Sequence, residues 1–240
     1  MYVKNIQKCS NRNNELEYAY QTSWGVTTRM IGALIMVHSD DDGLVLPPRI
    51  APTQVAIIPI GNNEEVNNLS NEIYDNLKNN GIKVMVDDSE KSPGFKFAEA
   101  EVNGIPVRIE IGARDLENNN ITIARRDTKE KTTVCKDIDI VEYVNNLMND
   151  IQINLFNKAK DRRDKQTYEC HSLDEIEKIM TTSPGFVKAD WCGDEACELK
   201  MKEIRGTKSR CILEDHKLID GKCVVCGKEA KHLVVWGIQY

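Results

Sequence analysis

The sequence predicts an α/β fold, because strand-like and helix-like segments alternate through the middle of the chain. Residues 55–60 form a short apolar run typical of a buried strand. Residues 62–79 carry apolar side chains at helical spacing and end before Gly81, which favours a helix with a glycine stop. Residues 82–86 predict the next strand, and residues 105–111 alternate apolar and other side chains as a further strand would.

Later segments continue this pattern. Residues 121–124 predict another strand after a turn rich in Asn. A longer helix is expected next, with one apolar face made of Ile140, Val144, Leu147, Ile151 and Leu155. Its strongly charged end, residues 158–165, is either a solvated helix end or a surface for nucleic acid. Ser172 and Glu175 form the capping-box pattern that opens another helix.

Composition limits the class of protein. The chain has 240 residues, 40% of them hydrophobic, and a formal net charge of −6. No apolar run approaches the roughly 20 residues needed to span a bilayer, and the N-terminus has no signal-peptide pattern, so we expect a cytoplasmic protein with no membrane partner. The acidic balance argues against nonspecific nucleic-acid binding, although cations gather locally between residues 108 and 136.

The first informative motif is QTSWGVTTR at residues 21–29, which continues through the apolar segment to Pro47-Pro48. It resembles the third conserved motif of class II aminoacyl-tRNA synthetases, in the form found in prolyl-tRNA synthetases of the archaeal and eukaryotic type. The resemblance implies the end of an antiparallel catalytic domain, in which a strand leads into a helix. It also implies that Arg29 is catalytic, that Gln21, Thr27 and Arg29 bind ATP, and that Ser23, Trp24 and Gly25 shape the proline site.

Elementary chemistry agrees with that role for Arg29. A guanidinium is planar, permanently charged and able to bind phosphate oxygens bidentately, so it can neutralise charge as pyrophosphate leaves. Gly25 is suited to close approach of the backbone to a ligand. We assign no role to His38, which is expected as a polar helix end.

A second motif begins with Ser-Pro-Gly-Phe-Lys-Phe at residues 92–97 and runs through residues 104–115. It resembles the anticodon-binding domain shared by the prolyl, threonyl, histidyl and glycyl enzymes, which implies an α/β domain with a mixed sheet. The tRNA-binding residues we expect are Phe95, Lys96, Glu110, Arg114 and Asp115, with Arg125, Arg126 and Lys131 as phosphate ligands. Phe97 and Ile109 are expected in the core, and Asp115 has the alternative of capping a turn.

Cysteines mark the end of the chain, since six of the eight follow residue 169. Two pairs, Cys192 with Cys197 and Cys223 with Cys226, have spacing suited to a closed tetrahedral zinc site. Such a site would stabilise a segment too small for a large core. Cys211 replacing one of the first pair, or free thiols, are the alternatives. The spacing is similar to that of the C-terminal zinc domain of archaeal-type prolyl enzymes, which implies a small α+β domain. Cys9, Cys135 and Cys170 are expected as buried small residues.

Together these motifs predict three domains: the end of a catalytic domain at residues 1–48, an anticodon-binding domain at 49–150 and a zinc-binding domain at 151–240. The resemblance covers only the C-terminal half of the length of the synthetases in this family. It implies a proline–tRNA ligase that uses L-proline, ATP with Mg²⁺, and tRNA-Pro. It also implies a homodimer formed through the N-terminal part of the catalytic domain. Because the other catalytic motifs are lacking, we expect this chain alone to be inactive.

Two alternatives stay open at this point. A noncatalytic tRNA-binding module with a structural zinc would need only the second and third segments. A zinc-dependent enzyme is disfavoured, since four thiolates leave no coordination position for water. The family ends in a Tyr with Gly-Arg before it, whereas here Gly237-Ile238-Gln239 precedes Tyr240.

Overall fold

The computed structural model describes residues 8–19, 22, 24–61, 63–214 and 216–238. The chain divides into two compact units, residues 1–37 and 38–240. In the first unit β1 (Lys8–Ser10) pairs antiparallel with β2 (Leu16–Tyr18). The helix α1 (Arg29–His38) begins in this unit and ends at the first residue of the second.

The second unit contains a mixed five-stranded sheet with the order β4-β3-β5-β6-β7. Strands β4 and β5 are parallel to β3, whereas β6 and β7 continue the sheet in antiparallel steps. The strands are β3 (Val55–Ile60), β4 (Val84–Val86), β5 (Val107–Gly112), β6 (Asn120–Arg125) and β7 (Lys131–Cys135). The helices are α2 (Glu64–Asn79), α3 (Pro93–Val102), α4 (Ala113–Glu117) and α5 (Ile140–Lys165).

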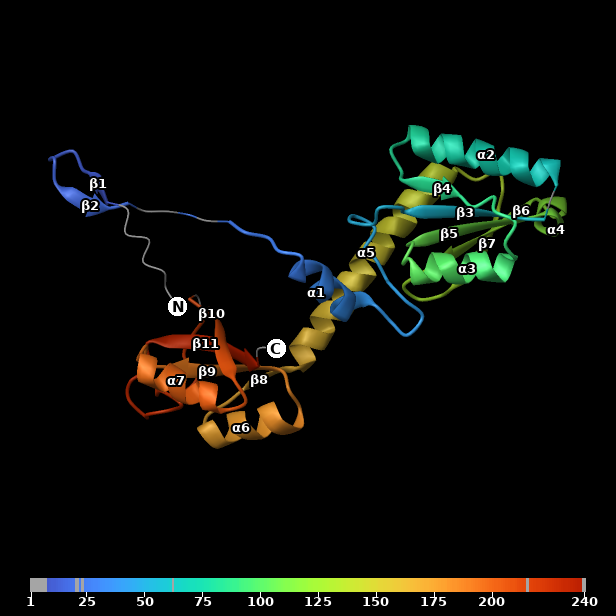
Figure 1. Ribbon diagram of the computed structural model, residues 1–240. Helices are drawn as coiled ribbons and strands as arrows, with labels where there is room; N and C mark the ends of the chain where they lie inside the picture. The colour runs from blue at the N-terminus through green and yellow to red at the C-terminus, as the bar shows by residue number, and fades with distance from the viewer. Residues whose placement is uncertain (1–7, 20–21, 23, 62, 215, 239–240) are drawn as a thin grey trace. The chain divides into compact units, whose positions relative to one another are not determined.

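Helices cover both faces of this sheet, and Figure 1 shows α2 and α3 on opposite sides of it. The main core lies between the sheet and the pair α2 and α5, with Ile109 of β5 fully buried at its centre. A smaller cluster of Ala56, Ala100 and Ile105 packs under α3. Since β5 is central, it is buried along its whole length, including at Arg108 and Glu110.

Helix ends follow local capping chemistry. Asn63 accepts a hydrogen bond from the Glu65 amide at the start of α2, and Asp139 accepts from two amides at the start of α5. The helix α2 ends at Asn79, and Gly81 beyond it has φ of +80°. The two N-terminal caps satisfy amides that the helices themselves leave without partners.

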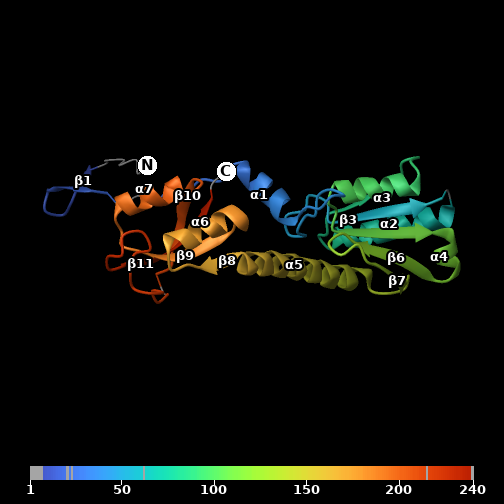
Figure 2. The same ribbon diagram turned by 90° about the horizontal axis from the view of Figure 1, so that it is seen from below.

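The four-stranded sheet of the C-terminal region has the order β10-β11-β9-β8. Its strands are β8 (Thr167–Glu169), β9 (Phe186–Trp191), β10 (Thr207–Ile212) and β11 (His232–Ile238). The helices α6 (Leu173–Thr182) and α7 (Glu195–Glu203) lie against this sheet, as Figure 2 shows. Their buried side chains, including Ile176 and Met201, surround Trp236 of β11.

Most elements expected from the sequence are present, and β3 has the expected bounds. The Ser172 hydroxyl accepts from the Glu175 amide as expected, but the Glu175 carboxylate accepts from the His171 amide. Helix α3 was not expected, although Ser92 and Pro93 form a common helix-start pattern, because Gly94 in its first turn is a poor helix former. The strand expected before Arg29 is absent from residues 22 and 24–28. A strand forms only where a neighbouring strand shares its backbone hydrogen bonds, and no described strand is paired with these residues. Within the described ranges, no helix combines the length and apolar character that crossing a membrane requires.

Candidate functional site

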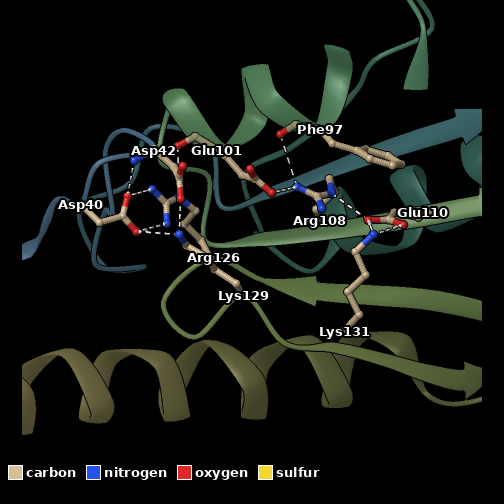
Figure 3. A network of polar contacts seen from close by, with 9 residues as sticks. All are labelled: Asp40, Asp42, Phe97, Glu101, Arg108, Glu110, Arg126, Lys129 and Lys131. Carbon is tan, nitrogen blue, oxygen red and sulfur yellow. Dashed lines mark hydrogen bonds and ion pairs between the residues drawn. The ribbon is translucent and has the colours of Figure 1, made fainter. Parts of the chain in front are cut away.

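An aromatic ring and three charged side chains meet between α3 and the sheet, and Figure 3 shows them from close by. The Phe97 ring has the Arg108 guanidinium 4.5 Å from its centroid and the Lys131 Nζ 4.9 Å from it. Glu110 joins the two cations, accepting from Arg108 Nε at 2.9 Å and lying 2.8 Å from Lys131 Nζ. We call Phe97, Arg108, Glu110 and Lys131 the Phe97 cluster.

The strand period explains why charged groups gather here. In β5, Val107, Ile109 and Ile111 belong to the main core, so Arg108 and Glu110 point to the opposite face, under α3. Both residues are buried, at 7% and 5% exposed, yet they pair with each other. Arg108 also donates to Glu101 of α3 at 3.0 Å. Lys131 is about half exposed, so the cluster opens to solvent at that side chain.

A second ion-pair group fixes residues 40–46 to the same domain. Arg126 donates two hydrogen bonds to the Asp40 carboxylate, at 2.7 and 2.5 Å, although the two residues are 86 positions apart. Lys129 pairs with Asp42 beside them (Figure 3). The hydrogen bonds from Arg126 hold the pKa of Asp40 well below its usual range.

Backbone contacts hold the same segment in place. The amides of Leu44 and Leu46 donate to the carbonyls of Val102 and Gly104. A Cβ added at Gly104, where φ is +68°, would lie 2.6 Å from the Leu44 side chain. Residues 40–46 therefore belong structurally with the sheet that follows them.

The expected tRNA-binding residues do not form one group. Glu110 and Lys131 lie in the Phe97 cluster, and Phe95 is exposed on α3 with Lys91 Nζ 4.9 Å from its ring centroid. Lys96 is buried and donates to the carbonyl of Asp87 at 2.8 Å. Arg114 is exposed on α4, and the half-buried Asp115 beside it has a carboxylate oxygen 3.3 Å from where a Cβ on Gly112 would lie.

The two arginines expected to hold phosphate are engaged within the chain. Arg126 is buried against Asp40. Arg125 makes two hydrogen bonds of 2.8 Å to Asp127, which also accepts from Asn154 of α5 at 2.6 Å. Burial raises the pKa of Asp127, but the bonds from Arg125 and Asn154 outweigh it and lower the pKa overall. These contacts tie β6 to α5.

Sequence reasoning missed half of the Phe97 cluster. Phe97 was expected in the core, but it is half-buried with cations beside its ring, whereas Ile109 is buried as expected. In the sequence, Arg108 is one of several cations between residues 108 and 136. The available signal was the charged pair at alternate positions of an apolar strand, since a buried charge needs a nearby partner.

The residues of the first motif lie in the first unit. Trp24, Gly25, Thr27 and Arg29 are exposed there, and Arg29 begins α1. Gln21, Ser23 and Tyr240 lie outside the described residues.

Four cysteines meet at the end of the C-terminal sheet. The Sγ atoms of Cys192, Cys197, Cys223 and Cys226 all lie within 4.8 Å of one another, and the first three residues are buried. Cys192 Sγ is 3.7 Å from Cys197 Sγ and 3.8 Å from Cys226 Sγ. A tetrahedral zinc with bonds of about 2.3 Å separates its sulfurs by about 3.8 Å, so the donor set fits such an ion.

The remaining cysteines lie elsewhere. Cys211 is exposed on β10 and is not among the four grouped sulfurs. Cys170 is buried as expected, and burial raises the pKa of its thiol to about 11. Cys9 and Cys135 are exposed, so the expectation that they are buried was wrong. Both lie on strands with an open face, which a pattern of isolated cysteines does not reveal.

Two family models match separate parts of the chain. Residues 54–147 match the family described as anticodon binding domain, and residues 173–240 match the family described as prolyl-tRNA synthetase, C-terminal. A proline–tRNA ligase of Clostridium novyi is 48% identical over 237 residues, which is 98% of this chain and 49% of the relative. One from Lachnoclostridium phytofermentans is 50% identical over the same share of each chain.

The fold is also similar to that of a solved prolyl-tRNA synthetase structure. The prolyl-tRNA synthetase of Cryptosporidium parvum, in a crystal structure with L-proline and AMP, matches with a TM-score of 0.88 and 36% identity. The match covers 97% of this chain and 51% of that one. The chain thus spans about half the length of the relatives it matches. It belongs to the prolyl-tRNA synthetase family and corresponds to the C-terminal half of its members.

Proposed function

We propose that this chain is the anticodon-recognising half of a proline–tRNA ligase, an enzyme that uses ATP to join L-proline to tRNA-Pro. The observation that carries the proposal is the Phe97 cluster, which lies inside the region matching the anticodon-binding family. The two bacterial relatives named above are proline–tRNA ligases, and each matches 98% of this chain.

The chemistry of the cluster suits an unpaired base. Single-stranded bases are recognised by stacking on aromatic or guanidinium planes and by hydrogen bonds to their edges. Phe97 and Arg108 supply the planes, and the carboxylates of Glu110 and Glu101 accept from base N–H groups. Lys131, partly exposed beside them, is placed to hold a phosphate. Phe95, Arg114 and Asp115 are further candidates on the same domain, whereas Lys96, Arg125 and Arg126 act within the chain.

Binding of a short RNA hairpin carrying the tRNA-Pro anticodon loop tests this proposal. Phe97→Ala is expected to weaken binding about 5- to 150-fold, because a stacked base contributes about 1 to 3 kcal/mol. Lys131→Ala is expected to weaken binding less and to reduce its salt dependence. Lys78→Ala is the control, since Lys78 lies exposed on α2 at the other face of the sheet. Equal affinity of Phe97→Ala and the unchanged chain would contradict the proposal.

The first unit supplies the end of the catalytic site in the complete enzyme. Arg29 and Thr27 are proposed to contact ATP with its Mg²⁺, together with Gln21, while Ser23, Trp24 and Gly25 adjoin the prolyl group. The structures of the Cryptosporidium parvum enzyme with L-proline and AMP, and with halofuginone and AMPPNP, support these substrates. In a complete enzyme, Arg29→Ala is expected to abolish proline-dependent exchange of pyrophosphate into ATP. Exchange at the unchanged rate would refute the role of Arg29.

The four cysteines are proposed to hold a structural zinc ion. Zinc bound by four thiolates supplies no open position for catalysis and contributes folding energy to its domain. We further propose that the complete enzyme is a homodimer formed by its N-terminal half and that it is located in the cytoplasm. The proposed domain limits within this chain are residues 48 and 150. Residues 40–46 lie before the proposed limit at residue 48, but their contacts are with the sheet that follows them.

A further inference from the structure

The last strand before the cysteine site carries a buried carboxylate. Asp190 of β9 is 3% exposed. Its Oδ1 accepts from the Ile219 amide at 3.0 Å, and its Oδ2 accepts from the amides of Asp220 and Gly221, both at 2.8 Å. A buried charge is costly unless hydrogen bonds compensate it, so three charge-assisted bonds hold this loop firmly.

The position of Asp190 relates the two cysteine pairs. It lies two residues before Cys192, and its side chain holds residues 219–221, which lead into Cys223. Its main-chain carbonyl accepts from the Val224 amide at 3.0 Å. One residue therefore fixes the chain on both sides of Cys223.

Other contacts keep this loop in a fixed form. Gly221 has φ of +71°, and its carbonyl accepts from the Ala230 amide at 3.0 Å. The Cys223 amide donates to the Lys228 carbonyl at 2.7 Å, which closes the turn that carries Cys226. The turn is thus rigid by itself, and the contact with Asp190 sets its position relative to β9.

We propose that Asp190 is the positioning residue that holds the second cysteine pair against the first and so sets how tightly the site retains its metal. This inference rests on the proposed function, in which the four cysteines bind zinc. A tetrahedral site tolerates little variation in sulfur spacing, so a loop already held at the required position loses less freedom on binding. Removing a partner that orients the ligands of a metal site commonly lowers metal affinity 10- to 100-fold.

The test compares zinc release to a chromophoric chelator from the folded chain and from Asp190→Asn. Asparagine keeps the shape, but its NH2 group faces at least one amide that needs an acceptor. We expect release to be at least about tenfold faster in Asp190→Asn. Ile176→Val, a small change on α6 in the same core that leaves the hydrogen bonds of Asp190 in place, is the matched control and is expected to release zinc at the original rate.

The outcomes separate the two proposals. If the unchanged chain takes up no zinc, the metal site itself is refuted, and this inference with it. If the unchanged chain holds zinc and Asp190→Asn releases it at the same rate, or Ile176→Val accelerates release equally, only the role of Asp190 is refuted. Should Asp190→Asn fail to fold, Asp190→Glu keeps the carboxylate but moves its oxygens away from the amides of residues 219–221. Faster release from Asp190→Glu supports the proposal, and an unchanged rate overturns it.

Discussion

The two sheets of the second unit are stabilised in different ways. The five-stranded sheet has helices on both faces, and a continuous aliphatic core lies between one face and the helices α2 and α5. The four-stranded sheet has a smaller core around Trp236, and a cluster of cysteines lies at its end. A small domain with a limited core commonly needs a metal or disulfides, and here cysteines placed for a metal occupy that position.

Loss of the proposed zinc ion is the change expected to separate the two regions most. Zinc contributes about 10 kcal/mol or more to the folding of small zinc domains, so Cys223→Ser or a strong chelator should unfold the C-terminal region. Hydrogen exchange should then show lost amide protection within residues 167–238 and unchanged protection in strands β3 to β7. Cys211→Ser is the control, because Cys211 is exposed outside the site. Equal loss of protection in both sheets would show that they do not fold independently.

The opposite change removes a side chain from the larger core. Ile109 is 0% exposed, and Ile109→Ala is expected to lower the free energy of unfolding by about 3 kcal/mol through lost burial and the cavity that remains. Zinc content should stay the same. Ile153→Ala, at an exposed position of α5, should change the free energy by less than about 0.5 kcal/mol. Denaturant unfolding measures both variants, and loss of zinc from Ile109→Ala would contradict a division between the regions.

The ion pair between Arg126 and Asp40 tests how much a buried charge matters in the same domain. Asp40→Asn leaves the buried Arg126 guanidinium without the carboxylate that neutralises it, which costs about 3 kcal/mol or more for a fully buried pair. Since the Asp40 side chain is 35% exposed, solvent screening reduces this to about 2 kcal/mol. The result is measured by denaturant unfolding of the chain and the variant at neutral pH.

The pH dependence of that difference has a definite sign. Arg126 lowers the pKa of Asp40 from its ordinary value of 3.8, so the folded state favours the charged carboxylate. Stability from this pair is therefore fully present above about pH 4 and declines as the pH falls towards the lowered pKa. The gap in unfolding free energy between the chain and Asp40→Asn should shrink in that acidic range. A gap that grows on acidification would contradict the assigned ion pair.

How well the sequence predicts an element or a contact depends on how far apart in the chain the residues that form it lie. A strand such as β3 and the helices α2 and α5 carry their burial pattern within a few residues, so periodicity was sufficient. Cysteine spacing likewise indicated the grouped sulfurs. The Arg126 pair joins residues 86 positions apart, and the Phe97 cluster draws on α3, β5 and β7. Such contacts depend on strand order, which no local pattern specifies.

The smallest effect is expected at an exposed ion pair of the same domain. Lys91 Nζ lies 2.7 Å from Glu99 Oε2, but the two side chains are 44% and 42% exposed. Water and salt screen such a pair, so Lys91→Ala should change the free energy of unfolding by no more than about 0.5 kcal/mol. Comparing it with Asp40→Asn under the same conditions contrasts a pair with two exposed partners with a pair whose arginine is buried. Surface ion pairs typically contribute roughly 0 to 1 kcal/mol. If Lys91→Ala loses about 2 kcal/mol, as much as Asp40→Asn, burial does not explain the difference between the two ion pairs.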